Sequence, residues 1–401
     1  MAFGATPGSP PAAATAYLRA GMKQVPVPFL RILKPFKPMN RNLPASWALL
    51  STIGLIAVLA RAQTPGPKAS TATPCMDVLH LFTAPNVPAF APTEIAASQK
   101  WRNGSPRPGL PGNGLAQHPM LYVGENCNTM FLVNDGKVVW TLSTGSGPEF
   151  DDVWMLSNGN ILFSRMAYVA EITPDKKVVW RYDCHVPGGP AHTEIHTCQP
   201  IGLDKVMFVE NGLPPKLKVV NIKTGAVEVN HELQYKPSAG VHGQLRRARV
   251  TAQGTYLVSY LNLGFVAEYD RDFKEIWKYQ ITSPWAALRL KKGDTLITDE
   301  KDSLTREVNA KGDTVWEFNC KTDLPAGYQF LSAPQSCTRL ANGNTLFTSR
   351  GSRSQGPQLI EVTPDKKIVW VLQDWTKVGD ATAVQILDDP GTPEIPGESE
   401  R

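Results

Sequence analysis

Short apolar segments separated by turn residues recur along most of this chain. The clearest copies are residues 157–180 (SNGNILFSRMAYVAEITPDKKVVW) and 341–370 (ANGNTLFTSRGSRSQGPQLIEVTPDKKIVW). Each contains an NGN turn, an apolar strand ending in Ser-Arg, a TPDKK turn and a final strand that ends on Trp. Self-similarity at tens of residues is typical of repeat architectures. The pattern predicts a repeating unit of four short strands.

Tryptophans mark the ends of these units, and they stand at positions 140, 180, 277, 316 and 370. The long gap after Trp180 holds a copy, residues 221–229, in which Val takes the place of Trp. The average period is therefore about 46 residues, the length of a four-stranded propeller blade. We expect these rings to pack between neighbouring blades on the outer strands.

The two ends of the repeat region complete each other. Residues 119–143 supply three strands (MLYVGEN, MFLVND and KVVWTLS), and residues 380–387 (DATAVQIL) supply one more. Joining them in one blade closes a ring, which hides the sheet edges that would otherwise pair with other chains. The sequence thus predicts an all-β fold over residues 118–390: a six-bladed β-propeller of four-stranded antiparallel blades, with the N- and C-terminal strands sharing one blade. Residues 391–401 are interpreted as a C-terminal tail.

Charge separates the N-terminal segment from the rest of the chain. Residues 1–62 carry seven basic residues and no acidic one, so the remainder has 34 basic and 36 acidic residues. This balance excludes a nucleic-acid-binding surface on the propeller. The apolar run 47–60 (WALLSTIGLIAVLA) ends in an A-x-A site at 60–62. Residues 1–62 are therefore predicted to be a signal peptide with an over-long leader, and an uncleaved anchor is the alternative.

The prediction of export sets the expectations for the rest of the chain. We expect a secreted or periplasmic monomer with no membrane span after cleavage. Residues 63–117 are rich in Pro and Gly and are interpreted as a linker or an extended strap. An even number of cysteines in an exported chain suggests disulfides. The repeated placement of the cysteines predicts the bridges Cys184–Cys198 and Cys320–Cys337, which leaves Cys75 with Cys127; free buried thiols are the alternative.

Polar residues on the innermost strands are the candidates for function, because alternate residues of those strands face the central channel. Four of the seven histidines (His185, His192, His196 and His242) fall on two adjacent blades. We expect the long connections 183–191, 231–241 and 320–329 to border the mouth of the channel. The predicted channel residues are Asp151, Asp152, His192, Glu194, His196, His242, Gln244, Arg246, Trp285, Gln335, Ser336, Asp380 and Thr382.

Several kinds of chemistry fit this set. His196 beside Glu194 and across from Arg246 suits proton transfer near neutral pH. Arginine and histidines converging on a channel also suit an anion. His192 and His196 lie about 13 Å apart on an extended strand and cannot share a metal ion unless the chain bends at the strand entrance, whereas Glu194, His196 and His242 could. No cofactor is otherwise predicted, and a solvated channel lining is the alternative without chemistry.

The NGN turns, the TPDKK-containing strands that end on Trp and the terminal closure resemble the secreted propellers grouped with arylsulfotransferases and with pyrroloquinoline-quinone-type repeat proteins. The resemblance covers residues 119–387. It implies a six-bladed periplasmic enzyme in which channel histidines and an arginine handle a sulfuryl group, one histidine being transiently sulfated. His196 is the histidine that matches. Six blades and the lack of an acidic calcium cluster in the sequence argue against the quinone-dependent activity.

The sequence therefore predicts an exported β-propeller whose channel binds a small molecule, a glycan or a partner protein. The alternative is a channel enzyme of arylsulfotransferase type, or a lyase or hydrolase, acting on an anionic or sugar-like substrate. In that case His196 would be the base or nucleophile, with His242 and Arg246 as the other catalytic residues. The binding residues would be His192, Glu194, Gln244, Trp285, Gln335, Asp151 and Asp380.

Overall fold

The computed structural model describes residues 75–84, 108–124, 127–144, 149–184, 192–326, 328, 334–350, 356–389 and 391–401. The predicted signal segment 1–62 lies outside these residues. Two of the three long connections predicted to border the channel, 183–191 and 320–329, lie partly outside them. Everything below concerns the unit that contains residues 67–401.

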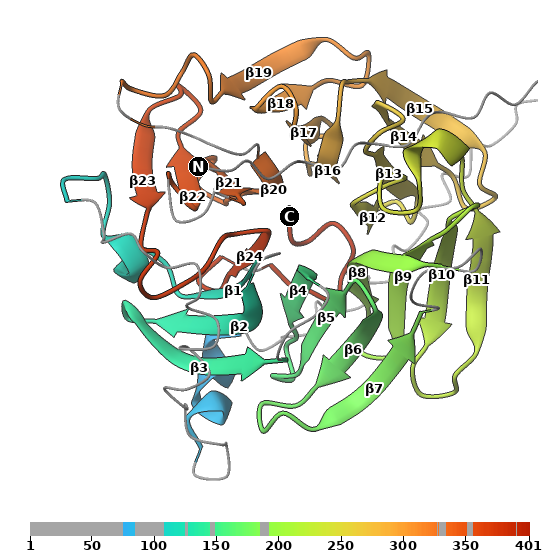
Figure 1. Ribbon diagram of the computed structural model, residues 1–401, viewed down its shortest axis with the longest axis horizontal. Helices are drawn as coiled ribbons and strands as arrows, with labels where there is room; N and C mark the ends of the chain where they lie inside the picture. The colour runs from blue at the N-terminus through green and yellow to red at the C-terminus, as the bar shows by residue number, and fades with distance from the viewer. Residues whose placement is uncertain are drawn as a thin grey trace, which may run out of the picture. The chain divides into compact units, whose positions relative to one another are not determined.

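Six four-stranded sheets are arranged around a common axis, and the chain passes from one sheet to the next (Figure 1). Neighbouring strands within each sheet are antiparallel. In blades 2 to 6 the first strand in chain order lies nearest the axis (Figure 1). The prediction of a six-bladed β-propeller is confirmed.

The strands of each blade, from the inside outwards, are as follows. Blade 1 contains β24 (Ala383–Ile386), β1 (Met120–Gly124), β2 (Cys127–Asn134) and β3 (Lys137–Ser143). Blade 2 contains β4 (Phe150–Met155), β5 (Ile161–Arg165), β6 (Tyr168–Ile172) and β7 (Val178–Asp183). Blade 3 contains β8 (Glu194–Ile201), β9 (Lys205–Asn211), β10 (Lys216–Asn221) and β11 (Val227–Glu232).

The second half of the ring repeats this order. Blade 4 contains β12 (Ala248–Val250), β13 (Tyr256–Tyr260), β14 (Phe265–Tyr269) and β15 (Glu275–Gln280). Blade 5 contains β16 (Pro284–Arg289), β17 (Thr295–Asp299), β18 (Leu304–Val308) and β19 (Thr314–Asn319). Blade 6 contains β20 (Pro334–Arg339), β21 (Thr345–Ser349), β22 (Leu359–Val362) and β23 (Ile368–Leu372).

Blade 1 is built from both ends of the repeat region. Strand β24 pairs with β1 in antiparallel register, from Met120 opposite Ile386 to Val123 opposite Ala383. The backbone continues this pairing, since Leu387 N–H donates to the Pro119 carbonyl oxygen at 2.9 Å. The predicted sharing of one blade by the terminal strands is confirmed, and the inner edge of β1 is covered by β24.

Tryptophans on the outer strands of blades 1, 4 and 5 connect each of these blades to the following one. Trp140 of blade 1 donates from Nε1 to the Pro174 carbonyl oxygen of blade 2 at 2.9 Å. Trp277 and Trp316 make the same kind of bond to a turn of the following blade, at 3.1 and 2.9 Å. These rings also join apolar clusters that span two blades. The predicted packing role of the tryptophans is therefore seen in the structure.

A buried glutamate stands opposite the tryptophan in four of the blades. Trp180, Trp277, Trp316 and Trp370 are paired with Glu171, Glu268, Glu307 and Glu361. Arg289 of blade 5 reaches back to Glu268 of blade 4, and Arg339 of blade 6 pairs with Glu307 of blade 5 at 2.7 Å. A buried carboxylate paired in this way stabilises the blade contact only while its partner is present.

His118 makes the equivalent connection between blades 6 and 1. Its Nε2 lies 3.3 Å from Glu361 Oε2, and its Nδ1 lies 3.1 Å from Asp388 Oδ2. Burial alone would lower the pKa of His118, but the hydrogen bonds with Asp388 and Glu361 raise the pKa to about 9. The imidazolium therefore links the segment before β1 to Glu361 of blade 6 and to Asp388, which follows β24.

The stability that His118 contributes is expected to depend on pH. Its folded-state pKa lies above the usual 6.5, so a contribution of about 1–3 kcal/mol is fully present below about pH 6.5 and is lost as the pH rises through about 9. We expect urea denaturation to show a higher free energy of unfolding for the wild type than for His118→Gln at pH 6, and a smaller gap at pH 10. A gap of constant size would mean that His118 stabilises only by packing on Trp370, whose ring centroid is 5.3 Å away.

Parts of the predicted linker 63–117 pack on the propeller. The 3₁₀ helix η1 (Cys75–Phe82) places Val78 and Phe82 in the apolar cluster of blades 1 and 2. The short helix η3 (Gly114–Ala116) contacts blade 6, because Trp370 Nε1 donates to the Gly114 carbonyl oxygen at 2.9 Å. Within the described part of the chain, no helix is long and apolar enough to cross a membrane.

The predicted disulfides are wrong for the cysteines whose side chains are described. Cys75, Cys184, Cys198, Cys320 and Cys337 are all free. Cys184 Sγ donates to the Thr193 carbonyl oxygen at 3.4 Å, and Thr193 precedes Cys198 by about 16 Å of extended strand. A disulfide needs Cα atoms within about 7 Å. Cys184 therefore lies near the start of the inner strand and Cys198 lies well along it.

The predicted Cys320–Cys337 bridge fails in the same way, and the predicted Cys75–Cys127 bridge is wrong because Cys75 is a free thiol. Cys320 follows the outer strand β19 as Cys184 follows β7, and Cys337 pairs with Phe347 as Cys198 pairs with Phe208. Cys75 donates from Sγ to the Met155 carbonyl oxygen at 3.5 Å, and the side chain of Cys127 lies outside the described residues. Burial raises the pKa of Cys75 and of Cys337 to about 12, so both stay protonated thiols.

Candidate functional site

Three imidazoles converge on the carboxylate of Glu194, the first residue of β8. His192 Nε2 lies 2.8 Å from Oε1, whereas His196 Nε2 and His242 Nδ1 each lie 2.8 Å from Oε2. A carboxylate only accepts hydrogen bonds, so each of these three nitrogens carries the proton. Glu194 therefore sets the tautomer and the orientation of three histidines when their imidazoles are neutral.

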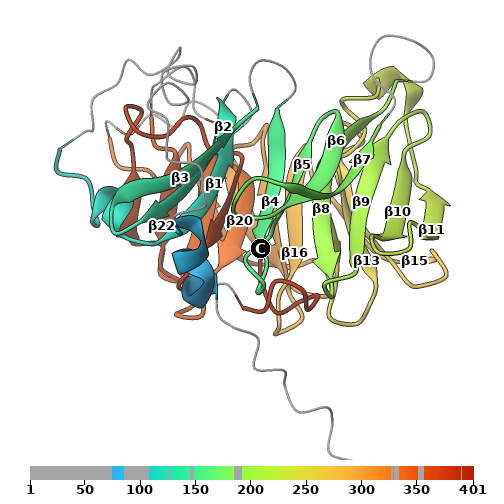
Figure 2. The ribbon, with the colours of Figure 1, turned by 90° about the horizontal axis from the view of Figure 1, so that it is seen from below.

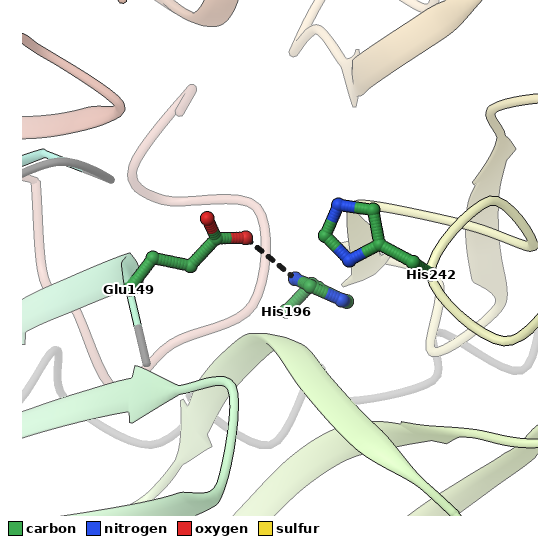
Figure 3. Close-up of side chains that lie close together, drawn as sticks. All are labelled: Glu149, His196 and His242. Carbon is green, nitrogen blue, oxygen red and sulfur yellow. Dashed lines mark ion pairs between the residues drawn. The ribbon is translucent and has the colours of Figure 1, made fainter. Parts of the chain in front are cut away.

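The other nitrogen of His196 faces two more carboxylates. His196 Nδ1 lies 3.2 Å from Asp151 Oδ1 and 3.7 Å from Glu149 Oε1. Figure 3 shows Glu149, His196 and His242 turned toward one another, and one ligand atom from each lies within 4.8 Å of the others. Glu149 and Asp151 stand at the start of β4, in the blade that precedes β8. We call Glu149, Asp151, His192, Glu194, His196, His242 and Arg246 the histidine cluster.

Burial and hydrogen bonding act in opposite directions on Glu194. Burial would raise the pKa of its carboxyl, but the hydrogen bonds from His196 and His242 hold that pKa well below its usual range. For His196, burial and the nearby Arg246 guanidinium lower the pKa, against the opposing effect of the Glu194 hydrogen bond. The pair is therefore an ionised carboxylate and a buried imidazole that favours its neutral form.

Access to solvent separates the histidines of the cluster. The side chain of His196 is 0% exposed and that of His192 is 22% exposed, whereas that of His242 is 56% exposed. His242 precedes the short inner strand β12, in the stretch where Arg246 donates from Nη1 to the His242 carbonyl oxygen. Of the three imidazoles, His242 is the one that a molecule from solution reaches first.

A second charged cluster follows the first along the inner strands. Asp152 accepts hydrogen bonds from Arg247 at 3.1 Å and from Arg249 at 2.8 Å, and Arg401 Nη2 lies 3.8 Å away. Burial would raise the pKa of Asp152, but these three arginines lower it. We call Asp152, Arg247, Arg249 and Arg401 the arginine cluster. It contains three buried guanidiniums around one carboxylate.

Aromatic rings line the arginine cluster. The Arg401 guanidinium carbon lies 4.1 Å from the centroid of a Trp154 ring, and that of Arg249 lies 5.0 Å from it. Arg247 takes the same position over Trp285, also at 5.0 Å. Stacking on an aromatic face stabilises a desolvated cation. Trp285, predicted as a binding residue, therefore packs against Arg247 instead.

The segment 391–401 closes the end of the ring that lies beyond the arginine cluster. It accepts backbone hydrogen bonds at Glu394 from Gly202 (2.9 Å) and at Glu400 from Arg339 (2.8 Å). Its side chains accept two more, from Ser157 N–H and Lys291 N–H, both at 2.6 Å. These four donors follow or end the inner strands of blades 2, 3, 5 and 6. Figure 2 shows the red C-terminal segment on the lower side of the ring. This segment contacts Gly202, just after the end of β8, so it lies at the end opposite to Glu194, with which β8 begins.

The structure brings together six of the predicted channel residues: Asp151, His192, Glu194, His196, His242 and Arg246. It does not bring the others into this cluster. Gln244 binds its own loop through Lys236 and Gly240, because the inner strand begins only at Ala248. Ser336 bonds to Thr348 at 3.1 Å. Gln335, Asp380 and Thr382 are buried in blades 6 and 1.

Four residues of the two clusters were not among the sequence candidates. Glu149 stands two residues before Asp151, just outside the predicted inner strand. Arg247 and Arg249 belong to the segment LRRARV, whose density of arginines on an inner strand was a usable signal. Arg401 had no such signal, because the strand pattern ends near residue 387. The contact between the segment 391–401 and the inner strands forms only in the folded chain.

Comparisons with known proteins identify the fold alone. No family model matches the sequence, and no curated protein matches it. A protein of unknown function from Bacteroides caccae is 23% identical, with a TM-score of 0.58 over 67% of this chain and 97% of that one. A streptogramin B lyase (13% identity, TM-score 0.46, 68% and 85% of the two chains) and BamB from Moraxella catarrhalis (14%, 0.38, 56% and 64%) are more distant. Of these three structures, the Bacteroides caccae protein alone has a TM-score above 0.5, and its similarity supports the fold described above.

Proposed function

We propose that the histidine cluster binds a small polar molecule and transfers a proton to or from it, as in a hydrolysis or an elimination. One observation carries the proposal: the Glu194 carboxylate holds His242 by Nδ1 at 2.8 Å while the side chain of His242 is 56% exposed. An imidazole oriented by a carboxylate is an efficient general base, because the carboxylate stabilises the imidazolium that forms. Export from the cytoplasm is part of the proposal and rests on residues 47–62.

His242 replaces His196 as the proposed proton acceptor. Both nitrogens of His196 face carboxylate oxygens, and its side chain is fully buried. A substrate atom could not approach either nitrogen without displacing Glu194 or Asp151. The same geometry disfavours the arylsulfotransferase-type alternative, in which His196 would have to carry a sulfuryl group on one of these nitrogens.

The remaining residues support the proton transfer. The proton leaves a substrate C–H or a water O–H and binds to Nε2 of His242, while Nδ1–H stays bonded to Glu194. The nearby Arg246 guanidinium is buried, and its Nε donates no hydrogen bond to the described part of the chain. Its Nη1 donates to the His242 carbonyl oxygen, so Arg246 fixes the backbone that carries the proposed proton acceptor.

The proposal is tested with a panel of p-nitrophenyl esters, phosphates and sulfates, the sulfates being offered together with a phenol as acceptor. We expect turnover of at least one class by the wild type, and about 100-fold or more lower turnover by His242→Gln and Glu194→Gln, the range that general acid–base groups supply. His231→Gln, on the outer strand β11, is the matched control and should keep wild-type turnover.

Two outcomes would contradict the proposal. Equal turnover by the wild type and His242→Gln would remove His242 from the reaction, and sulfate transfer lost only in His196→Gln would favour the arylsulfotransferase-type mechanism. A measurement without substrate adds a further check. Nitrogen NMR should find the His242 ring protonated at Nδ1 in the neutral form, and a ring protonated at Nε2 would leave no free base at the exposed nitrogen.

A further inference from the structure

The side chains of the arginine cluster hold more positive than negative charge. Asp152 Oδ1 lies 3.1 Å from Arg247 Nη1, 3.2 Å from Arg249 Nη2 and 3.8 Å from Arg401 Nη2. Because all three nitrogens approach the same oxygen atom, the three guanidiniums converge on one small region. All four side chains are buried. Three cations therefore share one carboxylate in a place where water screens their repulsion poorly.

The charge of Arg401 is the least satisfied of the three. None of its guanidinium nitrogens makes a hydrogen bond with the described part of the chain, and its ion pair with Asp152, at 3.8 Å, is too long for one. The guanidinium carbon lies 4.1 Å from the centroid of a Trp154 ring, which covers a face of the group and accepts nothing from the N–H groups at its edge. Burial lowers the pKa of Arg401 to about 9. A buried donor of this kind gains most from an added acceptor.

The protein holds the two neighbouring guanidiniums in place. Arg249 donates from Nη1 to Asp152 Oδ2 at 2.8 Å and from Nε to the main-chain oxygen of Arg401 at 2.9 Å. Arg247 donates from Nη2 to the main-chain carbonyl oxygen of Asp151 at 3.0 Å, and its Nε is buried without a hydrogen bond to the described part of the chain. The positive groups are therefore ordered before any ligand arrives, which lowers the entropic cost of binding one.

A small cavity adjoins these groups. It has a volume of about 20 Å³ and is lined by Gln199, Arg249, Arg289, Glu400 and Arg401, among other residues. Roughly 10–15 Å³ is enough for one water molecule. The cavity therefore has room for a single species somewhat larger than water, such as a chloride ion, and not for a tetrahedral oxyanion.

Other carboxylates near the arginine cluster are used elsewhere. The Glu394 side chain accepts a hydrogen bond from Ser157 N–H, and the Glu400 side chain accepts one from Lys291 N–H, both at 2.6 Å. Among the described residues, the ion pair of Arg401 is with Asp152 alone. The nearby acidic side chains therefore do not supply the acceptor that the Arg401 guanidinium lacks.

We propose that the arginine cluster binds one monatomic anion of the size of chloride, in the cavity lined by Arg249 and Arg401. The ion would accept hydrogen bonds from the Arg401 guanidinium and reduce the repulsion among the three cations. Arg401 belongs to the segment 391–401, whose backbone contacts Gly202 and Arg339. The ion would therefore strengthen the attachment of this segment to the ring. The inference is independent of the proposed proton transfer.

Urea denaturation of the full chain tests the proposal. Sodium chloride is replaced stepwise by sodium gluconate at constant ionic strength, so that general screening stays the same. A single ion that binds only the folded chain lowers the unfolding equilibrium constant about 10-fold for each 10-fold rise in chloride above its Kd. We expect this dependence in the wild type. No dependence on chloride would overturn the proposal, and the same saturable dependence on sulfate would overturn the assigned size of the ion.

Two variants assign the effect to the cluster. Arg401→Gln should lose the dependence on chloride. Arg401 lies outside the strands, so this variant is expected to fold, and circular dichroism checks that it does. Arg181→Gln is the matched control, because Arg181 is an exposed arginine on the outer strand β7 and should keep the wild-type dependence. Equal dependence on chloride in Arg401→Gln and in the wild type would contradict the site.

Bromide locates the ion without any variant. An anomalous difference map from wild-type crystals soaked in sodium bromide should show a peak within hydrogen-bonding distance of the Arg401 guanidinium, and that result would support the site even if Arg401→Gln failed to fold. A water molecule in the cavity together with bromide at the molecular surface only, which would be an adventitious ion only, would overturn the proposal.

Discussion

Asp152→Asn is expected to lower the free energy of unfolding by about 3–5 kcal/mol, the usual result of removing one partner from a buried ion pair. Asp152 is fully buried and is the carboxylate to which Arg247, Arg249 and Arg401 are all directed. Without its charge the guanidiniums remain desolvated and repel one another. Urea denaturation of the two proteins measures the difference.

A control and a rescue make this prediction specific. Asp183→Asn removes a carboxylate from an ion pair with Arg181 on the outside of blade 2, where both side chains are well exposed, and should change stability by less than about 1 kcal/mol. Adding Arg249→Met to Asp152→Asn removes one uncompensated charge and should restore part of the loss. If Asp152→Asn and Asp183→Asn lower the free energy of unfolding by the same amount, the stability of the arginine cluster does not depend on Asp152.

Trp370→Ala should cost about 3–5 kcal/mol of unfolding free energy, the range for deleting a buried aromatic ring. The Trp370 ring is 0% exposed, packs with the apolar cluster of blades 6 and 1, and donates to the Gly114 carbonyl oxygen at 2.9 Å. The substitution therefore leaves a cavity and an unpaired carbonyl at the point where the ring closes. Urea denaturation again gives the magnitude.

Trp277→Ala is the matched comparison for this prediction. Trp277 occupies the equivalent register position in blade 4 and donates to the Ala310 carbonyl oxygen at 3.1 Å, but it is only partly buried. Its removal should cost clearly less than the removal of Trp370. An equal or larger cost for Trp277→Ala would mean that the shared hydrogen bond, and not the burial of the ring, determines the contribution of these tryptophans.

The sequence predicted the fold because the fold is repeated. Each blade repeats the same turn chemistry and the same tryptophan, so the segment DATAVQIL could be recognised as a first strand without a blade of its own. The structure pairs Ala383–Ile386 of that segment with Met120–Val123. Alternation along β8 likewise placed Glu194 and His196 at the axis, where the structure has them.

Repetition also explains the errors. Cys184 and Cys320 occupy one repeated position, and Cys198 and Cys337 occupy another, so their similar spacing reflects equivalent places in two blades and not proximity within a pair. Alternation failed at Gln244 because the stretch before Ala248 is a loop. Contacts made by the segment 391–401, such as Arg401 with Asp152, depend on a path of the chain that no local pattern describes.

The two charged clusters differ in the sign of their charge along the axis of the ring. The histidine cluster holds three carboxylates beside one arginine, and the arginine cluster holds three arginines around Asp152. Such a gradient attracts the positive pole of a bound molecule toward the histidine cluster and its negative pole toward the arginine cluster. A zwitterionic molecule bound at the histidine cluster is therefore expected to lie with its anionic group nearer the arginine cluster, which selects one of two head-to-tail orientations.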